Sequence, residues 1–335
     1  MNLLVTGAAG FIGSRYVHHL LEAARAGGEP APVITVLDKL TYAGVLGNVP
    51  DDPAVTFVRG DIADAPLVDS LMAEADQVVH FAAESHVDRS ITSPGTFVRT
   101  NVLGTQMLLD ACLRHGVGPF VHVSTDEVYG SIEHGSWPEH QPLCPNSPYS
   151  ASKASSDLLA LSYHRTHGLD VRVTRCSNNY GPHQFPEKLV PLFVTNLLDG
   201  LRVPLYGDGL NVREWLHVDD HCLGVDLVRT QGRPGEVYHI GGGTELTNRD
   251  LTGLLLDAFG VGWDVVDPVA DRKGHDRRYA LDCAKAADEL GYRPRRDFAE
   301  GIARTIDWYR DNRAWWEPLK KRPAGPAAPR GAAAP

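Results

Sequence analysis

The first half of the chain alternates short apolar runs with longer amphipathic segments, and this rhythm is the strongest constraint on its fold. The apolar runs are rich in Val and Ile and nearly continuous, as is typical of strands buried on both faces. They predict strands over residues 3–6, 33–37, 55–58, 77–81, 120–124 and 171–175. The segments between them predict helices over residues 11–26, 66–75, 94–115 and 148–167. Strands that alternate with crossover helices indicate an α/β fold with a doubly wound parallel sheet.

The pattern changes after residue 175, where Pro and Gly become frequent and the apolar runs become shorter. We therefore expect residues 1–175 to form a nucleotide-binding domain, and residues 176–319 to form a smaller α/β substrate-binding domain over the carboxyl ends of the main sheet. Within the second part, Thr247-Asn248-Arg249-Asp250 predicts the start of a helix, because it combines capping side chains with an acid in the first turn. Residues 320–335 are dominated by Ala, Pro, Gly and basic residues, which predicts a disordered tail.

Composition excludes several classes of partner. The formal net charge of −10 over 335 residues argues against nucleic acid, since a polyanion is bound through clustered Lys and Arg. The five Cys residues form no C-x-x-C pair and the fifteen His residues form no ligand spacing, so no metal site is predicted. No apolar run reaches the length of about 18 residues that spans a bilayer, and no basic leader precedes the first strand. The sequence therefore predicts a cytoplasmic protein without a membrane span.

Three regularly spaced glycines, Gly7, Gly10 and Gly13, follow the first predicted strand and open the first predicted helix. They allow the backbone to turn tightly, to approach a pyrophosphate and to pack the helix on the sheet, while the helix N-terminus attracts the phosphate charge. Asp38 ends the second predicted strand, where a carboxylate accepts the ribose hydroxyls of adenosine and repels a 2′-phosphate. These features predict a Rossmann-type site for NAD rather than NADP.

A group of hydroxyls and carboxylates, Ser124-Thr125-Asp126-Glu127, ends the fifth predicted strand, and Tyr149 and Lys153 follow at helical i,i+4 spacing. A Lys ammonium near a phenol favours the phenolate, so we expect Lys153 to lower the pKa of Tyr149 from about 10. Such a Tyr takes a proton from a sugar hydroxyl while a nicotinamide takes the hydride from the same carbon. The two acids can divide further proton transfers if Asp126 is kept protonated and Glu127 ionised.

Taken together, these motifs resemble the extended short-chain dehydrogenase/reductases, enzymes that act on nucleotide sugars. Within that group, S-T-D-E-V-Y-G at residues 124–130 is similar to the dTDP-glucose 4,6-dehydratases, and residues 38–44, 80–90, 175–182, 211–215 and 274–279 agree with them. The resemblance runs from residue 1 to about residue 318. Two departures leave the chemistry intact: Ala8 stands where Gly is usual, and Lys273 replaces a common Pro before Gly274.

The resemblance implies a reaction on dTDP-glucose in three stages: oxidation at C4, loss of water from C5 and C6, and return of the hydride to C6 from tightly bound NAD. It implies that Thr125 hydrogen-bonds the C4 oxygen, that Glu127 removes the C5 proton and that Asp126 protonates the C6 hydroxyl. Tyr149 and Lys153 complete the expected catalytic set. The helices over residues 94–115 and 148–167 resemble the pair that forms a four-helix homodimer interface in this superfamily.

Two groups of binding residues are expected from position in the motifs and from the resemblance. The residues expected to bind NAD are Gly7, Gly10, Phe11, Ile12, Gly13, Asp38, Lys39, Thr41, Asp61, Ile62, Phe81, Ala82, Ala83, Ser85, Thr100, Ser124, Tyr149, Lys153 and Asn179. Those expected to bind the nucleotide sugar are Ser85, Thr125, Asn178, Lys188, Leu189, Pro204, Tyr206, Arg213, Asn248, Arg272 and His275.

Two other functions remain as alternatives to a 4,6-dehydratase. A nucleotide-sugar 4-epimerase or decarboxylase would share the fold, the cofactor and the oxidation at C4, but an epimerase needs no acid–base pair for eliminating water, so Asp126 and Glu127 disfavour it. A NAD-binding sensor without catalysis is the alternative from another class. Such a protein is expected to lack the Tyr, the Lys or the acids, and all of them are present. The choice between thymine and uracil, and between glucose and another hexose, rests on the resemblance.

Overall fold

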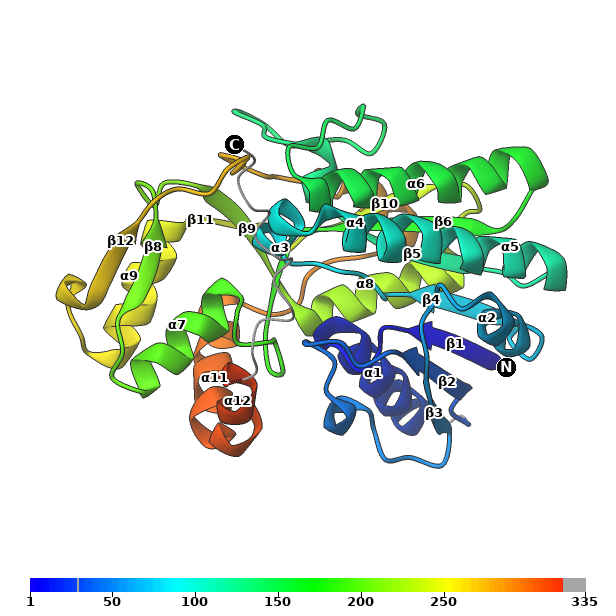
Figure 1. Ribbon diagram of the computed structural model, residues 1–335, viewed down its shortest axis with the longest axis horizontal. Helices are drawn as coiled ribbons and strands as arrows, with labels where there is room; N and C mark the ends of the chain where they lie inside the picture. The colour runs from blue at the N-terminus through cyan, green and yellow to red at the C-terminus, as the bar shows by residue number, and fades with distance from the viewer. Residues whose placement is uncertain (29, 322–335) are drawn as a thin grey trace, which may run out of the picture.

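The computed structural model describes residues 1–28 and 30–321. Its centre is a seven-stranded parallel sheet in the order β10-β6-β5-β4-β1-β2-β3 (Figure 1). The strands are β1 (Asn2–Thr6), β2 (Val33–Asp38), β3 (Val55–Arg59), β4 (Gln77–His80), β5 (Phe120–Thr125), β6 (Val171–Cys176) and β10 (Val237–Ile240). The predicted doubly wound α/β fold is confirmed. Each of the six predicted strands is found, with ends that differ by at most one residue.

Helices cover both faces of this sheet (Figure 1). On one face, α1 (Phe11–Gly27), α8 (Val218–Gln231) and α10 (Ala284–Leu290) bury an apolar cluster that includes Tyr16 and Val225. On the other face, α2 (Ala65–Met72), α5 (Thr105–His115) and α6 (Pro148–His167) bury a second cluster that includes Leu108 and Ala160. With apolar layers on both sides, the inner strands β5 and β6 are buried at every position, which explains their continuous apolar runs.

The segment predicted as one helix over residues 94–115 is helical throughout but not uniform. It divides into α4 (Pro94–Phe97), the π-helical stretch η2 (Val98–Gly104) and α5, and the short helix α3 (Val87–Thr92) precedes it. The wider turn places Asn101 inside, where its amide donates to the Glu84 carbonyl at 3.0 Å and to Ser152 Oγ at 2.8 Å. Such bulges recur at functional sites. Through Asn101, this π-helical stretch connects the loop that follows β4 with α6.

The second part of the chain builds a smaller α/β layer with its own core. Its strands are β7 (Asn178–Tyr180), β8 (Val203–Tyr206), β9 (Val212–His217), β11 (Thr244–Thr247) and β12 (Val266–Val269), and its helices are α7 (Leu189–Leu198), α9 (Asn248–Phe259), α11 (Phe298–Asp311) and α12 (Arg313–Lys320). They form the sheets β11-β9-β7 and β12-β8 around a cluster that includes Phe193 and Trp316. Figure 1 shows this layer beyond the carboxyl ends of the main strands.

Three details refine the predicted boundaries. Thr247 and Asp250 form a reciprocal capping box at the start of α9, which confirms the predicted helix start. Before α9 the chain returns to the main sheet, since α8 and β10 come from the second half but pack with the first. Helix α12 extends to Lys320, whereas residues 322–335 of the predicted tail lie outside the described residues. No helix within residues 1–28 and 30–321 is both long and apolar enough to cross a membrane.

Candidate active site

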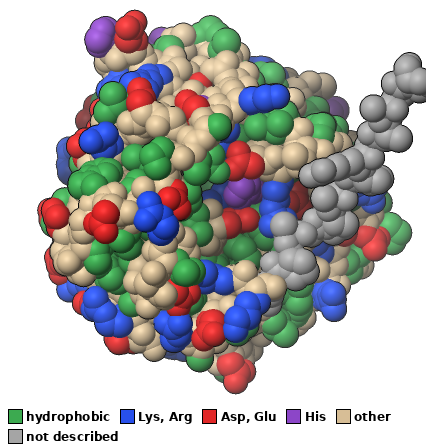
Figure 2. Space-filling view, turned by 60° about the vertical axis from the view of Figure 1, so that its left-hand side comes forward, with side chains coloured by type: hydrophobic (Ala, Val, Ile, Leu, Met, Phe, Trp, Pro, Cys, Tyr) green, Lys and Arg blue, Asp and Glu red, His purple; other side chains and the backbone are tan. Residues whose placement is uncertain are grey.

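The principal pocket opens at the carboxyl ends of the central strands, around the point between β1 and β4 where the strand order reverses. In doubly wound sheets this is the place where ligands bind. Figure 2 shows the hollow between the two parts of the molecule, with acidic, basic and His side chains gathered around it. Its lining comes from the loops after β1, β2, β4, β5 and β6 and from residues 184–188 of the second half.

Gly7 and Gly13 of the loop after β1 are packed too tightly to carry a side chain. Gly7 has a φ of +73°, and a Cβ on it would lie 2.5 Å from the Ala82 nitrogen. A Cβ on Gly13 would lie 2.7 Å from the Gly7 carbonyl oxygen. Helix α1 then starts at Gly10 without a side-chain cap and without an acid in its first turn. Its free N–H groups therefore face the pocket, an arrangement that fits the pyrophosphate of a dinucleotide.

Asp38 ends β2 and is built into the same loop. One carboxylate oxygen accepts from the Ala9 nitrogen at 3.0 Å and the other from the Leu40 nitrogen at 2.8 Å. Burial raises the pKa of Asp38, and these two N–H donors oppose that effect. Each oxygen keeps a further lone pair for a hydroxyl donor, so the carboxylate fits a ribose diol.

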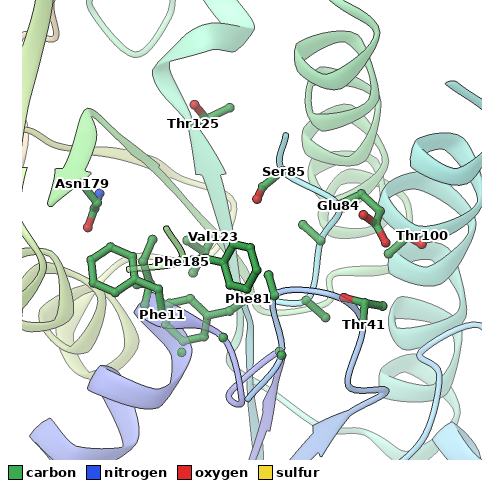
Figure 3. Close-up of a pocket in the computed structure, with 18 of the residues that line it drawn as sticks. Phe11, Thr41, Phe81, Glu84, Ser85, Thr100, Val123, Thr125, Asn179 and Phe185 are labelled. Carbon is green, nitrogen blue, oxygen red and sulfur yellow. The ribbon is translucent and has the colours of Figure 1, made fainter. Parts of the chain in front are cut away.

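All of the residues expected to bind NAD line this one pocket. Figure 3 shows Ser85, Glu84 and Thr100 on one side of it and Asn179 on the other. Several lining residues were not predicted, among them Glu84, Cys176, Ser177, Gln184, Phe185 and Glu187. Glu84 lies inside a stretch that carries the family resemblance and was within reach of that comparison. Cys176 and Ser177 lie inside another such stretch, residues 175–182. Gln184, Phe185 and Glu187 follow it in a segment with no periodic pattern, and only the fold brings those three to the pocket.

Asp126 opens the short helix η3 (Asp126–Tyr129) directly after β5. Thr125 caps this helix, accepting from the Glu127 nitrogen at 3.3 Å, and its hydroxyl donates to Asp126 Oδ1 at 3.1 Å. Asp126 is only 2% exposed. Burial raises its pKa well above the usual range, and the nearby charges of Glu127 and Glu214 add to the effect. This environment favours the protonated form of the carboxyl, which a proton donor requires.

Glu127 has a different environment, although it is the next residue. It is half-buried and also lines the pocket. Burial raises the pKa of Glu127, while the charges of Arg213 and Lys188 oppose that rise. Cations thus favour the ionised form of Glu127, and acids disfavour the ionised form of Asp126. Burial thus raises the pKa of both carboxyls, but nearby cations limit the rise at Glu127 and nearby acids add to the rise at Asp126. A difference in this direction favours Glu127 as the base and Asp126 as the acid.

Tyr149 and Lys153 lie on the first turns of α6, which Ser147 caps. The Lys153 ammonium donates to the Val123 carbonyl at 2.8 Å, and burial lowers the pKa of Lys153 to about 8. The prediction that Lys153 lowers the pKa of Tyr149 is wrong. Burial and then the Glu127 charge raise the pKa of Tyr149 well above its usual value, and a hydrogen bond with Thr125 opposes them only in part.

The residues expected to bind the sugar nucleotide fall into two groups. Ser85, Thr125, Asn178 and Lys188 line the principal pocket. The remaining seven, Leu189, Pro204, Tyr206, Arg213, Asn248, Arg272 and His275, lie outside its lining. Within this second group, Arg272 lies over the Tyr206 ring at 5.3 Å, and the rings of Tyr206 and His275 are 6.5 Å apart. The charges of Arg213 and Arg272 both act on Glu127.

Residues 1–28 and 30–321 contain no group of three or more His, Cys, Asp or Glu side chains arranged to hold a metal ion. The pocket lining itself offers hydroxyls, carboxyls and the side chains of Lys39, Lys153 and Lys188, together with the dinucleotide cradle.

Comparison with known proteins agrees with this geometry. A family model described as GDP-mannose 4,6 dehydratase matches residues 4–305. A dTDP-glucose 4,6-dehydratase of Streptomyces antibioticus is 98% identical over 329 residues, which cover 98% of each chain. Among solved structures, a dTDP-glucose 4,6-dehydratase of Streptomyces venezuelae with NAD bound has a TM-score of 0.93 and 64% identity, and the match covers 95% of this chain and 100% of that chain.

A UDP-glucose 4-epimerase of Thermotoga maritima is less similar, with a TM-score of 0.84 and 32% identity over 93% of this chain and 99% of that chain. The epimerase shares the fold, but the Streptomyces venezuelae dehydratase shares twice the sequence identity with this chain. Because the family model and the relatives cover almost the whole chain, the family assignment does not depend on one motif. The chain belongs to the nucleotide-sugar 4,6-dehydratases, and within them to the dTDP-glucose 4,6-dehydratases.

Proposed function

We propose that the chain is an NAD-dependent hydro-lyase that converts dTDP-glucose to dTDP-4-keto-6-deoxyglucose. The observation that carries this proposal is the pair Asp126 and Glu127 at the end of β5. One carboxyl is buried and has a pKa raised well above its usual range, and its neighbour is held near cations. Eliminating water requires a base that acts at one carbon of the sugar and an acid that acts at the hydroxyl of the adjacent carbon, and this pair supplies both.

The glycine loop, the uncapped N-terminus of α1 and Asp38 fit NAD, and we assign the residues expected to bind it to that role. Bound NAD accepts the hydride from C4 and returns it to C6. Lys153 donates one hydrogen bond to Val123, so its ammonium keeps two N–H groups for the cofactor side of the pocket.

The protein groups move the protons. Tyr149 takes the proton of the C4 hydroxyl as its phenolate, a form that burial disfavours and that the cationic nicotinamide of bound NAD would favour. Thr125 holds the C4 oxygen, and the resulting ketone makes the C5 proton acidic. Glu127 removes that proton, and Asp126 protonates the C6 hydroxyl so that it leaves as water. Once the hydride has returned to C6, Glu127 gives its proton back to C5.

The second group of residues binds the nucleotide in this proposal. Arg213, Arg272 and Lys188 supply the positive charge that a diphosphate requires, and a guanidinium makes bidentate contacts with it. Leu189, Pro204, Tyr206, Asn248 and His275 contact the base and its sugar, while Ser85 and Asn178 contact the hexose.

We also propose a homodimer that pairs the helices over residues 94–115 and 148–167. Apolar side chains are exposed along these helices, at 55% for Val98, 37% for Leu103 and 55% for Leu158. Burying such a row against a second copy is favourable. All five Cys residues are free thiols, which suits a reducing compartment, and we propose the cytoplasm.

Turnover of dTDP-glucose deuterated at C4 tests the reaction. A 4-keto-6-deoxy product that carries deuterium at C6, followed by mass spectrometry and NMR, is expected. Formation of dTDP-galactose without loss of water would identify an epimerase, and binding without any turnover would identify a sensor. Parallel assays with UDP-glucose test the choice of base, because the proposal expects preference for the thymidine nucleotide.

A further inference from the structure

Residues 184–188, in the second half of the chain, line the pocket. They are held by side chains of the first half that do not line the pocket themselves. Gln184, Phe185, Glu187 and Lys188 face the pocket, whereas Tyr42 and Arg89 are absent from its lining. The Tyr42 hydroxyl donates to Glu187 Oε1 at 2.7 Å. The Arg89 guanidinium donates to Glu187 Oε2 at 3.3 Å. Each oxygen of this one carboxylate is therefore bound by a different segment of the first half.

The two donors also contact each other. The Arg89 guanidinium carbon lies 3.4 Å from the centre of the Tyr42 ring, within the range of a cation–π contact. Each of these three side chains thus contacts the other two, and we name them the Glu187 clasp (Tyr42, Arg89 and Glu187). His86 Nε2 also lies 3.7 Å from Glu187 Oε2. The side chains of Glu187 and Arg89 are 17% and 26% exposed. Partial exclusion of water strengthens charge-assisted hydrogen bonds of this kind.

Neighbouring contacts hold the same segment. The Phe185 ring meets the Tyr42 ring edge-on at 5.4 Å, and Lys188 Nζ donates to the Ser85 carbonyl at 2.8 Å. Tyr42 belongs to the loop after β2, between the pocket residues Thr41 and Ala43. The clasp therefore joins the loop that follows Asp38 to residues 184–188, which reach the pocket from the second half of the chain.

The proposed reaction explains why such a link matters. NAD is reduced and then reoxidised within one turnover, so the cofactor never has to leave. Release of reduced cofactor in mid-cycle would leave the ketone intermediate without its hydride. We propose that Tyr42 and Arg89 are positioning residues that hold Glu187 and residues 184–188 across the dinucleotide site, so that bound NAD is retained through the cycle. This inference rests on the proposed function.

The test measures release of NAD rather than turnover. Loaded protein is mixed with an excess of isotopically labelled NAD, and the label retained after rapid gel filtration gives the exchange rate. Two variants open the clasp: Tyr42→Phe removes one hydroxyl, and Arg89→Met removes the guanidinium while keeping an unbranched chain. Because a hydrogen bond to a charged group contributes enough for about a tenfold change or more, we expect both variants to exchange NAD at least about tenfold faster than the wild type.

Tyr238→Phe is the matched control. The Tyr238 hydroxyl also donates to a glutamate, Glu289, at 2.9 Å, but on β10 and outside the pocket lining. We expect this control to exchange NAD within about twofold of the wild type, with a melting temperature similar to that of Tyr42→Phe. The positioning role would be overturned if both clasp variants exchange NAD within twofold of the wild-type rate, or if Tyr238→Phe exchanges NAD as fast as the clasp variants do. Either result would leave the proposed function intact. A wild-type protein that retains no NAD at all would instead overturn the proposed cofactor.

Discussion

Thr125 donates a 3.1 Å hydrogen bond to Oδ1 of Asp126, while Oδ2 of Asp126 is buried with no hydrogen-bond partner in the described part of the chain. An orphaned buried carboxyl oxygen is costly unless the group is neutral or a ligand completes it. Thr125 thus orients the carboxyl and leaves its other oxygen for the substrate. In the proposed reaction, that oxygen carries the proton that the C6 hydroxyl takes as it leaves.

Glu127→Gln is expected to retain NAD and to oxidise C4, but to lose dehydration by about 10²–10⁴-fold, the usual contribution of a general base. An amide cannot take the C5 proton. The measurement follows exchange of the C5 proton with D₂O by NMR, together with formation of the 4-keto-6-deoxy product. Full turnover by this variant would remove Glu127 from its role.

Asp126→Asn separates the acid from the base. Glu127 remains, so C5 should still exchange with D₂O, but the C6 hydroxyl is not protonated and the product should form about 10²–10⁴-fold more slowly. NMR of the same incubations distinguishes the two variants. Loss of C5 exchange in Asp126→Asn would show that the two carboxyls do not divide the work in this way.

Lys153 links stability to pH. Burial lowers its pKa from 10.5 to about 8, so between these values the unfolded chain binds the extra proton and the folded chain does not. Stability therefore rises as the pH increases from about 8 to 10.5, and the gain is about 3 kcal/mol at about 1.4 kcal/mol per pKa unit. Below about pH 8 both states carry the charge, and the penalty for burying it is fully present.

Lys153→Met tests this linkage, because it keeps the length of the side chain and removes the charge. The free energy of unfolding of both proteins is measured in urea from pH 7 to 10.5. The wild-type value should rise with pH relative to the value for the variant at the same pH. The loss of the hydrogen bond to Val123 affects the variant equally at every pH. Parallel curves for the two proteins would contradict the lowered pKa.

Asp38→Ala should weaken NAD binding by about 10–100-fold, since a buried carboxylate and its hydrogen bonds contribute about 1.5–3 kcal/mol. The carboxylate also accepts from Ala9 and Leu40, so its loss loosens the glycine loop. The preference for NAD over NADP should shrink as well, because the charge that repels a 2′-phosphate is gone. Titration calorimetry with both cofactors measures the two effects.

The control for Asp38→Ala is Asp64→Ala, which removes the helix cap of α2 outside the pocket lining. Its affinity for NAD should stay close to that of the wild type. An unchanged ratio of NAD to NADP affinity in Asp38→Ala would contradict the assigned role.

Leu158→Glu is expected to disrupt the proposed dimer. Leu158 is 55% exposed on α6, and a charge at the centre of an apolar interface costs several kcal/mol on association. Sedimentation velocity should show twice the chain mass for the wild type and a monomer for the variant. Leu254→Glu, at a 45% exposed position on α9, is the control and should stay dimeric. A monomeric wild type would rule out the interface.

Local pattern accounts for much of the fold. The strands from β1 to β6 and the helix α6 were predicted with ends within one residue, because their apolar periodicity and capping signals are local. The π-helical stretch η2 was not foreseen, since it depends on Asn101 reaching Glu84 and Ser152 from other segments. The place of β10 in the main sheet was not foreseen either. Val237–Ile240 is a short run in the second half, and its pairing with β6 spans more than sixty residues.

The candidate site likewise combines features that depend on neighbouring residues in the chain with features that depend on the fold. The sequence by itself determined the dinucleotide cradle and the order of chemical groups at the end of β5, because each depends on residues close together in the chain. Only the tertiary structure decided that Asp126 is buried beside Glu127 and Glu214, and that Tyr149 has a raised rather than a lowered pKa. It also decided that Tyr42 binds Glu187, 145 residues away. The physical reason is that burial and charge act through space, so the strength of an acid and the partner of a carboxylate depend on side chains that the fold brings together from distant segments.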